Sequence, residues 1–361
     1  MLIVADDLTG AADTAGAFAV AGHETVVILH RANQNVPNPN VSIPNVSIPN
    51  TAIPNTAIPK VPSAQTAVVA IDTDSRAMPE SAAFDATAAA VSLHPRRPLF
   101  VKIDSTMRGH VLATVLATIA GRSASGSGVE PSRVVVCPAF PMLGRTVVRG
   151  WVCLDDVPID NGQLGPIFAA VAATTDVVIA DARSDADLDA LVRANLDPQH
   201  PNATLWVGSA GLARHVAQQM GPTRGATASQ TEVGGPPNRH PATKIVVVVG
   251  SQHQQTSAQV ARLRADTRIV QIDPREPGHI DEILPVLIEG DGLVLTGGHT
   301  ARVVLDALGI DWLRVTGEVE VGMPWSLATR AGRTISIVTK AGGFGNEMAL
   351  RRAVEFLEQP S

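Results

Sequence analysis

Residues 98–109 read PLFVKIDSTMRG, a short apolar run that turns polar within one residue. The apolar part is typical of a buried parallel strand. In open α/β sheets ligands bind beyond the carboxyl ends of the strands, so the polar residues that follow are placed to meet a ligand. Lys102 and Arg108 suit an anionic group, while Asp104 and Ser105 can bond to hydroxyls. A small hydroxy acid would satisfy all four side chains, although a strand end followed by a solvated, capped turn explains the same residues.

A second strand end of the same kind opens the chain. Residues 2–5 read LIVA, DDLTG follows, and residues 11–21 are small and helix-forming, with Thr9 or Asp7 placed to cap the helix. A cap accounts for one carboxylate and leaves its neighbour free. Adjacent carboxylates at a helix start can orient hydroxyls, hold a metal ion or take a proton from an attacking alcohol. Asp6 and Asp7 are therefore the candidate catalytic residues.

Strand and helix patterns alternate along most of the chain, which is typical of a mostly parallel α/β sheet. At 361 residues the chain exceeds the usual single-domain size, and a Gly- and Pro-rich linker follows Met220. We expect two α/β domains with mostly parallel sheets and an interdomain cleft: an N-terminal domain over residues 1–220, a linker over 221–243 and a C-terminal domain over 244–361. The expected strands after the first are residues 25–29, 67–71, 99–103, 133–137, 176–180, 203–207, 244–249, 268–272, 292–296, 314–319 and 334–338.

Residues 36–62 form a low-complexity insert in the expected N-terminal domain. Within it, residues 41–60 repeat a five-residue unit that ends in Ile-Pro-Asn or, at the last repeat, in Ile-Pro-Lys. Proline every five residues forbids a regular helix and interrupts a central strand. We expect an extended, largely disordered surface loop that the site does not require.

Three glycine-containing turns in the expected C-terminal domain each follow an apolar strand and precede a helix. They are GS at 250–251, GGHT at 297–300 and KAGGFG at 340–345. Glycine lets the backbone approach a ligand closely, and helix N-termini favour anions. One such turn is weak evidence, but three in one domain predict a nucleotide site. The chain has no GxxxxGK[ST] loop and no GxGxxG after its first strand, which argues against a Walker-type ATPase and an ordinary Rossmann dehydrogenase.

The composition argues against several other classes of protein. A net charge of −6, 3% aromatic residues and no tyrosine do not suit the basic and stacking surfaces of nucleic-acid binders. No apolar run approaches the length of about 20 residues that a membrane span needs, and the N-terminus lacks the pattern of a signal peptide, so we expect a cytoplasmic protein. Cys137 and Cys153 do not have the spacing of a zinc site or a disulfide framework.

Seven short motifs together resemble the four-carbon acid sugar kinase family, whose members phosphorylate threonate, erythronate or 3-oxo-tetronate with ATP. They occur in the family's order and extend over nearly the whole chain apart from the insert. The motifs are VADDLTGA (4–11), KIDSTMRG (102–109), PAFP with GR (138–145), GSAGL (208–212), GS (250–251), GGHT (297–300) and KAGGFG (340–345). The resemblance implies a kinase that binds the sugar acid in its N-terminal domain and ATP in its C-terminal domain, and transfers phosphate to the terminal hydroxyl across the cleft.

The resemblance also assigns roles to individual residues. Arg145 would face the substrate together with the Lys102 to Arg108 segment. Lys102 and Arg108 would hold the substrate carboxylate, Asp104 with Asp6 or Asp7 would orient the hydroxyls, and one of these last two acids would receive the proton. The implied ATP-binding residues are Ser251, Gly297, Gly298, His299, Thr300 and Gly342.

The expected cofactors are ATP and the Mg²⁺ that accompanies it, although no set of metal ligands can be read from the sequence. The expected partner is a small sugar acid, with no nucleic acid and no membrane, and homo-oligomer formation stays open. The family usually has Glu where this chain has His299, and the chain is short for the family. These departures keep open a catalytically inactive protein that binds sugar acid and nucleotide. A nucleotide-dependent sugar-acid dehydrogenase is the weaker alternative, because the dinucleotide fingerprint is missing.

Overall fold

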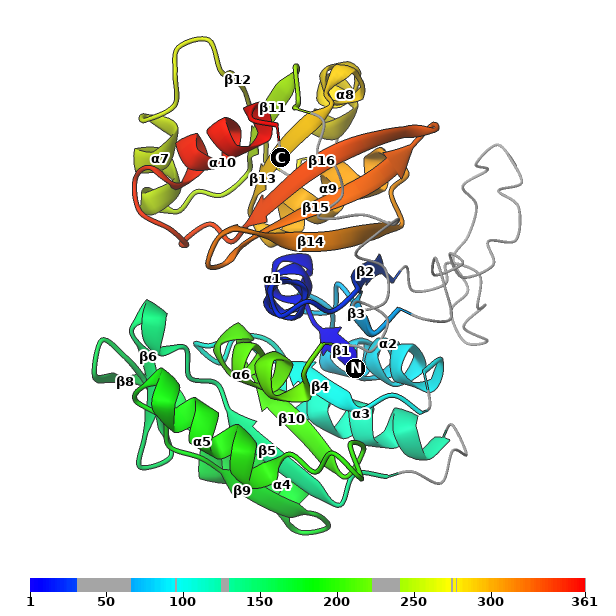
Figure 1. Cartoon of the computed structure of the whole chain (residues 1–361), viewed down its shortest axis with the longest axis vertical. Coiled ribbons are helices and arrows are strands. Elements are labelled where there is room, and N and C mark those ends of the chain that lie inside the picture. The colour runs from blue at the N-terminus through cyan, green and yellow to red at the C-terminus, as the bar shows by residue number, and fades with distance from the viewer. Residues whose placement is uncertain are drawn as a thin grey trace, which may run out of the picture.

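The computed structural model describes residues 1–30, 66–94, 96–124, 130–222, 241–273, 275–276 and 278–360. The expected insert at 36–62 and residues 223–240 of the expected linker lie outside the described residues. The fold is mixed α/β with one large, mostly parallel sheet, so the expected fold class is confirmed. Figure 1 shows the N-terminal half, residues 1–222, below and the C-terminal half, residues 241–360, above.

The N-terminal half contributes seven parallel strands to the sheet. The strands nearest the centre of the molecule are short, apolar and buried at every position, because helices cover both faces of a parallel sheet. The strands are β1 (Leu2–Ala5), β2 (Thr25–Leu29), β3 (Val68–Asp72), β4 (Leu99–Lys102), β5 (Arg133–Cys137), β9 (Asp176–Ile179) and β10 (Thr204–Gly208). The helices are α1 (Leu8–Val20), α2 (Glu80–Ser92), α3 (Val111–Ala124), α4 (Leu164–Ala172), α5 (Asp185–Asn195) and α6 (Ala210–Met220).

The C-terminal half contributes the remaining strands of the same sheet. They are β11 (Ile245–Val249), β12 (Arg268–Gln271), β13 (Gly292–Thr296), β14 (Trp312–Glu320), β15 (Met323–Arg330) and β16 (Arg333–Lys340). Its helices are α7 (Gln254–Val260), α8 (His279–Glu289), α9 (Gly298–Ala307) and α10 (Ala349–Glu358). The whole sheet has thirteen strands in the order β12-β11-β13-β16-β15-β14-β2-β3-β1-β4-β10-β5-β9.

Strands β14 and β2 join the two halves within this sheet. They pair antiparallel, with Trp312 opposite Ile28 and Val315 opposite Thr25. The sheet order alone does not define where one domain ends and the next begins. The boundaries at 220 and 244 therefore stay a prediction.

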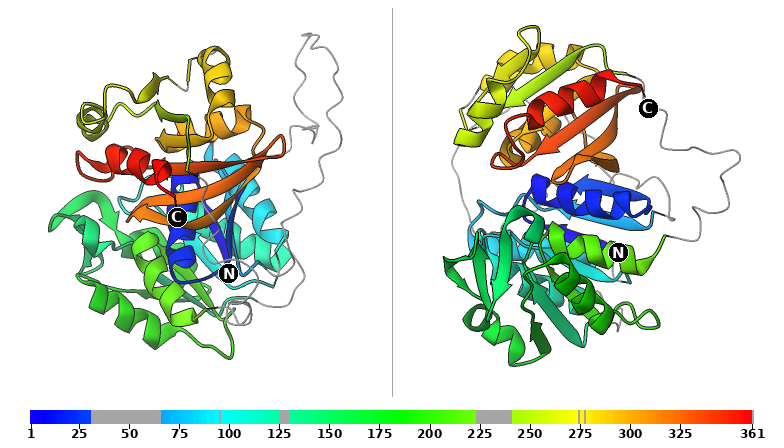
Figure 2. Two further views of the ribbon diagram at one scale, coloured as in Figure 1. Left: turned by 45° about the horizontal axis from the view of Figure 1, so that its top comes forward. Right: turned by 60° about the vertical axis from the view of Figure 1, so that its left-hand side comes forward.

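Helix α1 lies between the two halves, as Figures 1 and 2 show. It packs against β3 and α6 of the N-terminal half and against β14 and α9 of the C-terminal half. Its sequence, LTGAADTAGAFAV, consists mainly of small residues, which allows burial from Leu8 to Phe18. The helix begins after its N-cap Asp7, whose Oδ1 accepts a hydrogen bond from the Gly10 amide at 3.0 Å. The first turn of α1 is thus held at the junction of the halves.

The sequence patterns missed two features of the fold. Strand β15 lies between β14 and β16 and pairs antiparallel with both, because short turns connect the three. A separate three-stranded antiparallel sheet is formed by β6 (Arg145–Val148), β7 (Trp151–Leu154) and β8 (Val157–Gln163). The other strands agree closely with the expected ranges. Among the described residues, no helix combines the length and apolar character that crossing a membrane requires.

Candidate active site

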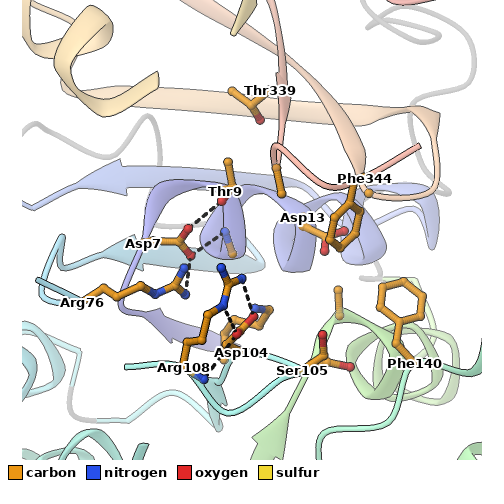
Figure 3. A pocket seen from close by; sticks show the side chains of 16 residues that line it. Asp7, Thr9, Asp13, Arg76, Asp104, Ser105, Arg108, Phe140, Thr339 and Phe344 are labelled. Carbon is orange, nitrogen blue, oxygen red and sulfur yellow. Dashed lines mark hydrogen bonds and ion pairs between the residues drawn. The ribbon is translucent and has the colours of Figure 1, made fainter. Parts of the chain in front are cut away.

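A pocket lies beside α1 where the two halves meet, and Figure 3 shows the side chains around it. In the N-terminal half its walls come from the starts of α1 and α6, the end of β4 and the loops after β3, β4 and β5. In the C-terminal half they come from the neighbourhood of β15 and β16. The lining residues are Asp7, Thr9, Gly10, Asp13, Arg76, Lys102, Asp104, Ser105, Arg108, Phe140, Ser209, Ala210, Gly322, Thr339, Ala341 and Phe344.

The two polar strand ends identified in the sequence meet in this pocket. Strands β1 and β4 are parallel neighbours, with Ala5 opposite Lys102, so the residues that follow them lie at the same edge of the sheet. Five of the candidate residues line the pocket: Asp7, Lys102, Asp104, Ser105 and Arg108. Asp7 is about a hundred positions from the other four in the sequence, and the pairing of β1 with β4 brings them together.

Arg76, in the loop after β3, holds the two adjacent carboxylates in different ways. Its Nε and Nη2 donate to both oxygens of Asp6, at 2.9 and 2.6 Å, and Nη2 also donates to Asp7 Oδ1 at 2.9 Å. Asp6 is buried and is not among the pocket-lining residues. Asp7 lines the pocket, and its Oδ2 accepts a hydrogen bond from Thr9 Oγ1 at 2.6 Å. The geometry therefore distinguishes Asp7, which faces the pocket, from Asp6, which anchors Arg76.

Lys102 is the pocket cation best placed for an anionic ligand. It is buried, with 7% of its surface exposed, and within the described part of the chain its ammonium group makes no hydrogen bond or ion pair. A methyl group added at Gly10 would lie 3.1 Å from Lys102 Nζ, so the glycine leaves room for this side chain. Ser105 is buried in the same wall. A buried ammonium group that makes no hydrogen bond is costly, and a bound anion would supply the acceptor.

Asp104 and Arg108 pair with each other. Arg108 Nη2 donates to Asp104 Oδ1 at 3.1 Å and Nε donates to Oδ2, which also accepts from Thr106 Oγ1 at 2.6 Å. Burial alone would raise the pKa of Asp104, but Arg108, Lys102 and Thr106 together hold the pKa well below its usual range. Asp104 is thus an ionised acceptor at neutral pH. The Arg108 side chain is 68% exposed, so its remaining donors are accessible to a ligand.

Arg145, at the start of β6, lies beside the pocket and is not one of its lining residues. Its guanidinium carbon is 5.3 Å from the centre of the Phe344 ring, which lines the pocket from the C-terminal half. Burial lowers the pKa of Arg145, while the charges of Asp104 and Asp13 oppose that effect. Its Nε atom is buried and has no hydrogen-bond partner among the described residues. A role for Arg145 in substrate binding stays a prediction.

The three glycine turns of the C-terminal half converge. They follow β11, β13 and β16, which are parallel neighbours. A methyl group added at Gly250 would collide with Thr300 Oγ1, and one added at Gly342 would collide with Ser251 Oγ. Gly297, the N-cap of α9, has a φ of 102°, a region that favours glycine. The turns therefore form a close-packed backbone cradle at the N-terminus of α9.

Lys340 holds the third of these turns in place through hydrogen bonds to its backbone. It is fully buried at the end of β16, and its Nζ donates to the carbonyl oxygens of Ala341, Gly342 and Phe344 at 2.8, 2.9 and 3.2 Å. Burial lowers the pKa of Lys340 to about 8. The sequence motif contained this lysine, but its role in shaping the turn became visible only in the structure. His299 lies in the first turn of α9 with its side chain exposed, so its backbone N–H is one of those at the helix N-terminus.

Gly298 connects the glycine turns to the polar strand ends. A methyl group added there would lie 2.7 Å from Asp7 Oδ2 and 3.0 Å from Thr9 Oγ1. The first turn of α9 is therefore packed against the first turn of α1, with the Asp7 carboxylate between them.

Sequence reasoning missed several residues of the pocket. Arg76 follows the sequence Asp-Thr-Asp-Ser, which begins at the last residue of β3. This is a polar strand end of the kind already recognised twice, so the same rule could have found Arg76. Asp13 lies within a helix of small residues and carries no comparable signal. Phe344 was part of a motif, but nothing in the sequence indicated that its ring would line a pocket with Asp7 and Lys102.

Two models of known protein families match parts of the chain. Residues 1–166 match the model of a sugar-binding N-terminal domain, and residues 280–350 match the model of a nucleotide-binding C-terminal domain. A solved structure from Haemophilus influenzae, of a protein from a domain family of unknown function, has a TM-score of 0.63 at 17% identity. It covers 99% of this chain and 100% of its own, and it shows the same fold.

Two named relatives match the chain from end to end. A D-threonate kinase from Cupriavidus necator is 28% identical, with 98% of this chain and 96% of the relative covered. A 3-oxo-tetronate kinase from Brucella melitensis is 22% identical, with 99% of this chain and 95% of the relative covered. With both domain models in the same order, these matches confirm the resemblance seen in the motifs: over nearly its whole length the chain is similar to the four-carbon acid sugar kinases.

Proposed function

We propose that the protein transfers the γ-phosphoryl group of ATP to the terminal hydroxyl of a four-carbon sugar acid, which is threonate, erythronate or 3-oxo-tetronate. The observation that carries the proposal is the packing of Gly298 against Asp7, because it brings the glycine turns of one half to the polar strand ends of the other. The names of the full-length relatives support the substrate class. A cytoplasmic location, where ATP is available, belongs to the same proposal.

The sugar acid would lie against the N-terminal wall of the pocket. Lys102, whose ammonium group makes no hydrogen bond or close ion pair among the described residues, meets the carboxylate, and the accessible donors of Arg108 assist it. Ionised Asp104 accepts hydrogen bonds from substrate hydroxyls, and Ser105 can donate or accept. Arg145 closes the site from the side of Phe344. The pocket therefore combines cations for one end of a short acid with acceptors for its hydroxyls.

The cradle of glycine turns fits the phosphates of a nucleotide, since its glycines leave no room for side chains and α9 directs backbone N–H groups toward it. Ser251, Gly297, Gly298, His299, Thr300 and Gly342 are the proposed ATP-binding residues. ATP with Mg²⁺ would supply the reactive phosphoryl group and neutralise its charge. Among the described residues, no three His, Cys, Asp or Glu side chains gather into a metal site, so we assign no protein ligand to Mg²⁺.

Asp7 is the proposed acceptor of the proton from the attacking hydroxyl. Thr9, Gly10 and Arg76 each donate a hydrogen bond to its carboxylate, which fixes its orientation between the two helix N-termini. Phosphoryl transfer depends mainly on positioning and charge neutralisation, and a positioned base adds to these. Asp6 keeps Arg76 in place and takes no direct part.

A screen of ADP release tests the function. The purified protein is incubated with Mg-ATP and, one at a time, with the D and L forms of threonate and erythronate and with 3-oxo-tetronate. We expect ADP release that depends on one of these acids, with the phosphate recovered on the terminal hydroxyl. Binding of an acid and of ATP without turnover would support the inactive alternative, and no binding of any acid would overturn the proposal.

Replacing Lys102 with Ala should raise KM for the sugar acid and leave kcat less affected. Lys102 meets a charge that is present in the ground state as well as in the transition state. Hydrogen bonds to charged groups contribute roughly 1.5–3 kcal/mol, so the expected increase in KM is about tenfold to hundredfold. Steady-state kinetics at saturating Mg-ATP measure it. Exposed Lys244, just before β11, is the matched control, and an equal effect of Lys244→Ala would contradict the assignment.

Replacing Gly342 with Ala should weaken ATP binding by at least about tenfold and spare the sugar acid, because the new methyl group collides with Ser251 inside the cradle. Gly317→Ala is the matched control, since nothing lies within 4 Å of a methyl group there. Calorimetry with each ligand separately gives both affinities. Unchanged ATP affinity in Gly342→Ala would show that the nucleotide binds elsewhere. A change at Gly298 would be less informative, because it also disturbs Asp7.

A further inference from the structure

Asp13 is a carboxyl group in the pocket wall that the proposed mechanism does not use. It lies in α1 one helical turn after Thr9, so both residues are on the face of the helix that lines the pocket. Only 7% of its surface is exposed. In Figure 3 its side chain lies beside Phe344, on the opposite side of the pocket from Arg76.

The carboxyl group of Asp13 has no hydrogen-bonding partner within the described part of the chain. Its Oδ1 is buried and unpaired, and no ion pair reaches either oxygen. This contrasts with Asp6, Asp7 and Asp104, each of which is held by an arginine or by several donors. A buried, unpartnered polar group is costly in the protein alone. A ligand in the pocket is the available partner.

The charged groups that face Asp13 come from several elements. Lys102 at the end of β4, Arg145 of β6 and Arg214 of α6 are cations, while Asp7 and Glu318 of β14 are anions. Arg214 donates to both oxygens of Glu318, so these two largely neutralise each other. Burial is the dominant effect and raises the pKa of Asp13 to about 7. In the protein alone, the neutral form of Asp13 is therefore substantially populated near physiological pH.

A sugar acid bound at Lys102 would change this balance. Its carboxylate neutralises the nearest cation and adds a negative charge, and both effects favour the neutral form of Asp13. A neutral carboxyl group can donate a hydrogen bond, which an ionised one cannot. We propose that Asp13 is a substrate-binding residue that donates a hydrogen bond from its protonated carboxyl group to an oxygen of the sugar acid, so that binding of the acid takes up a proton. The inference rests on the proposed function, because it requires an anionic ligand in this pocket.

The sign of the pH dependence follows from linkage. If the bound form requires protonated Asp13, the affinity is constant below the pKa of the free protein, which is about 7 for Asp13, and falls as the pH rises above it. The expected loss of affinity is about tenfold for each pH unit above that value. Asn at position 13 keeps a donor of the same shape and has no proton to take up.

Calorimetry without ATP tests the inference. D-threonate, or the acid that the ADP-release screen prefers, is titrated at pH 7.5 in buffers of different ionisation enthalpy, and its affinity is measured from pH 6 to 8.5. We expect the wild-type protein to take up a fraction of a proton and to bind more weakly at high pH. Asp13→Asn should bind within a few-fold of the wild type at pH 6.5, without proton uptake or pH dependence. Asp13→Ala should lose about tenfold or more in affinity.

Exposed Asp85 in α2 provides the matched control, and Asp85→Asn should behave as the wild type. Binding without proton uptake in the wild type would overturn the inference, as would proton uptake that persists in Asp13→Asn. An Asn variant that binds as poorly as the Ala variant would show that the ionised carboxylate is the binding form. These outcomes leave the proposed function intact, whereas failure of every four-carbon acid to bind would overturn both. If Asp13→Asn does not fold, binding by the wild type without proton uptake still overturns the inference, and Asp13→Ala serves as the second variant in the proton-uptake measurement.

Discussion

We expect Asp7→Asn to lower kcat by about 10²- to 10⁴-fold, the usual contribution of a general base. The substitution keeps the size of the side chain and most of its hydrogen bonds but removes its ability to accept a proton. Because that proton moves only during phosphoryl transfer, KM for the sugar acid should change by no more than a few-fold. Steady-state kinetics at saturating Mg-ATP separate the two parameters.

The adjacent carboxylate supplies the matched control for this experiment. Asp6 is paired with Arg76 through both oxygens and is not among the residues that line the pocket. We expect Asp6→Asn to lower the thermal stability and to reduce kcat much less than Asp7→Asn does. A kcat close to wild type in Asp7→Asn would show that the base is wrongly assigned, and Asp104 would be the next carboxylate to replace.

Most strands of the large sheet were predictable because local patterns determine them, and their alternation with helices indicated parallel pairing, but the antiparallel pairing of β14, β15 and β16 was not predicted. Val134 to Cys137 and Leu293 to Leu295 are continuous apolar runs, and the structure buries them as central parallel strands. Strand β15 was missed because the turn between β15 and β16 lacks the usual sequence signal of a hairpin. Ala331 and Gly332 have φ values of 46° and 76°, which is the conformation of a two-residue hairpin turn. Alanine is rare in that conformation, so the turn did not resemble the usual Asn-Gly or Asp-Gly pairs.

The pocket was predictable to the extent that strand ends determine it. Asp7, Lys102 and Asp104 lie at the carboxyl ends of apolar strands, and the rule that ligands bind there was enough to predict that they meet. Asp13 is different, because its proposed role in binding depends on burial of its carboxyl group by elements on both sides of α1. That burial arises only when β14 pairs with β2 and places the C-terminal half against the helix. A pairing between residues almost three hundred positions apart leaves no local pattern in the sequence.

Replacing Arg302 with Leu should destabilise the protein by about 3–5 kcal/mol, the usual cost of leaving one partner of a buried ion pair uncompensated. Arg302, in α9, donates from Nη1 to Asp72 Oδ2 at 2.8 Å and from Nη2 to the His30 carbonyl at 2.9 Å. Both side chains are buried, with 5% and 0% exposed. Denaturant unfolding measures the loss.

The exposed pair between Arg351 and Glu355 in α10 is the matched control. It has the same 2.8 Å separation, but both side chains are about 40% exposed, so Arg351→Leu should cost only about 0.3–0.5 kcal/mol. Adding Asp72→Asn to Arg302→Leu should recover part of the stability, because the unpaired charge is then removed. Equal losses from both arginines would contradict the prediction. Arg302 connects the helix that carries Gly298 and Thr300 to the end of β3, so its loss should also raise KM for ATP under conditions where the variant remains folded.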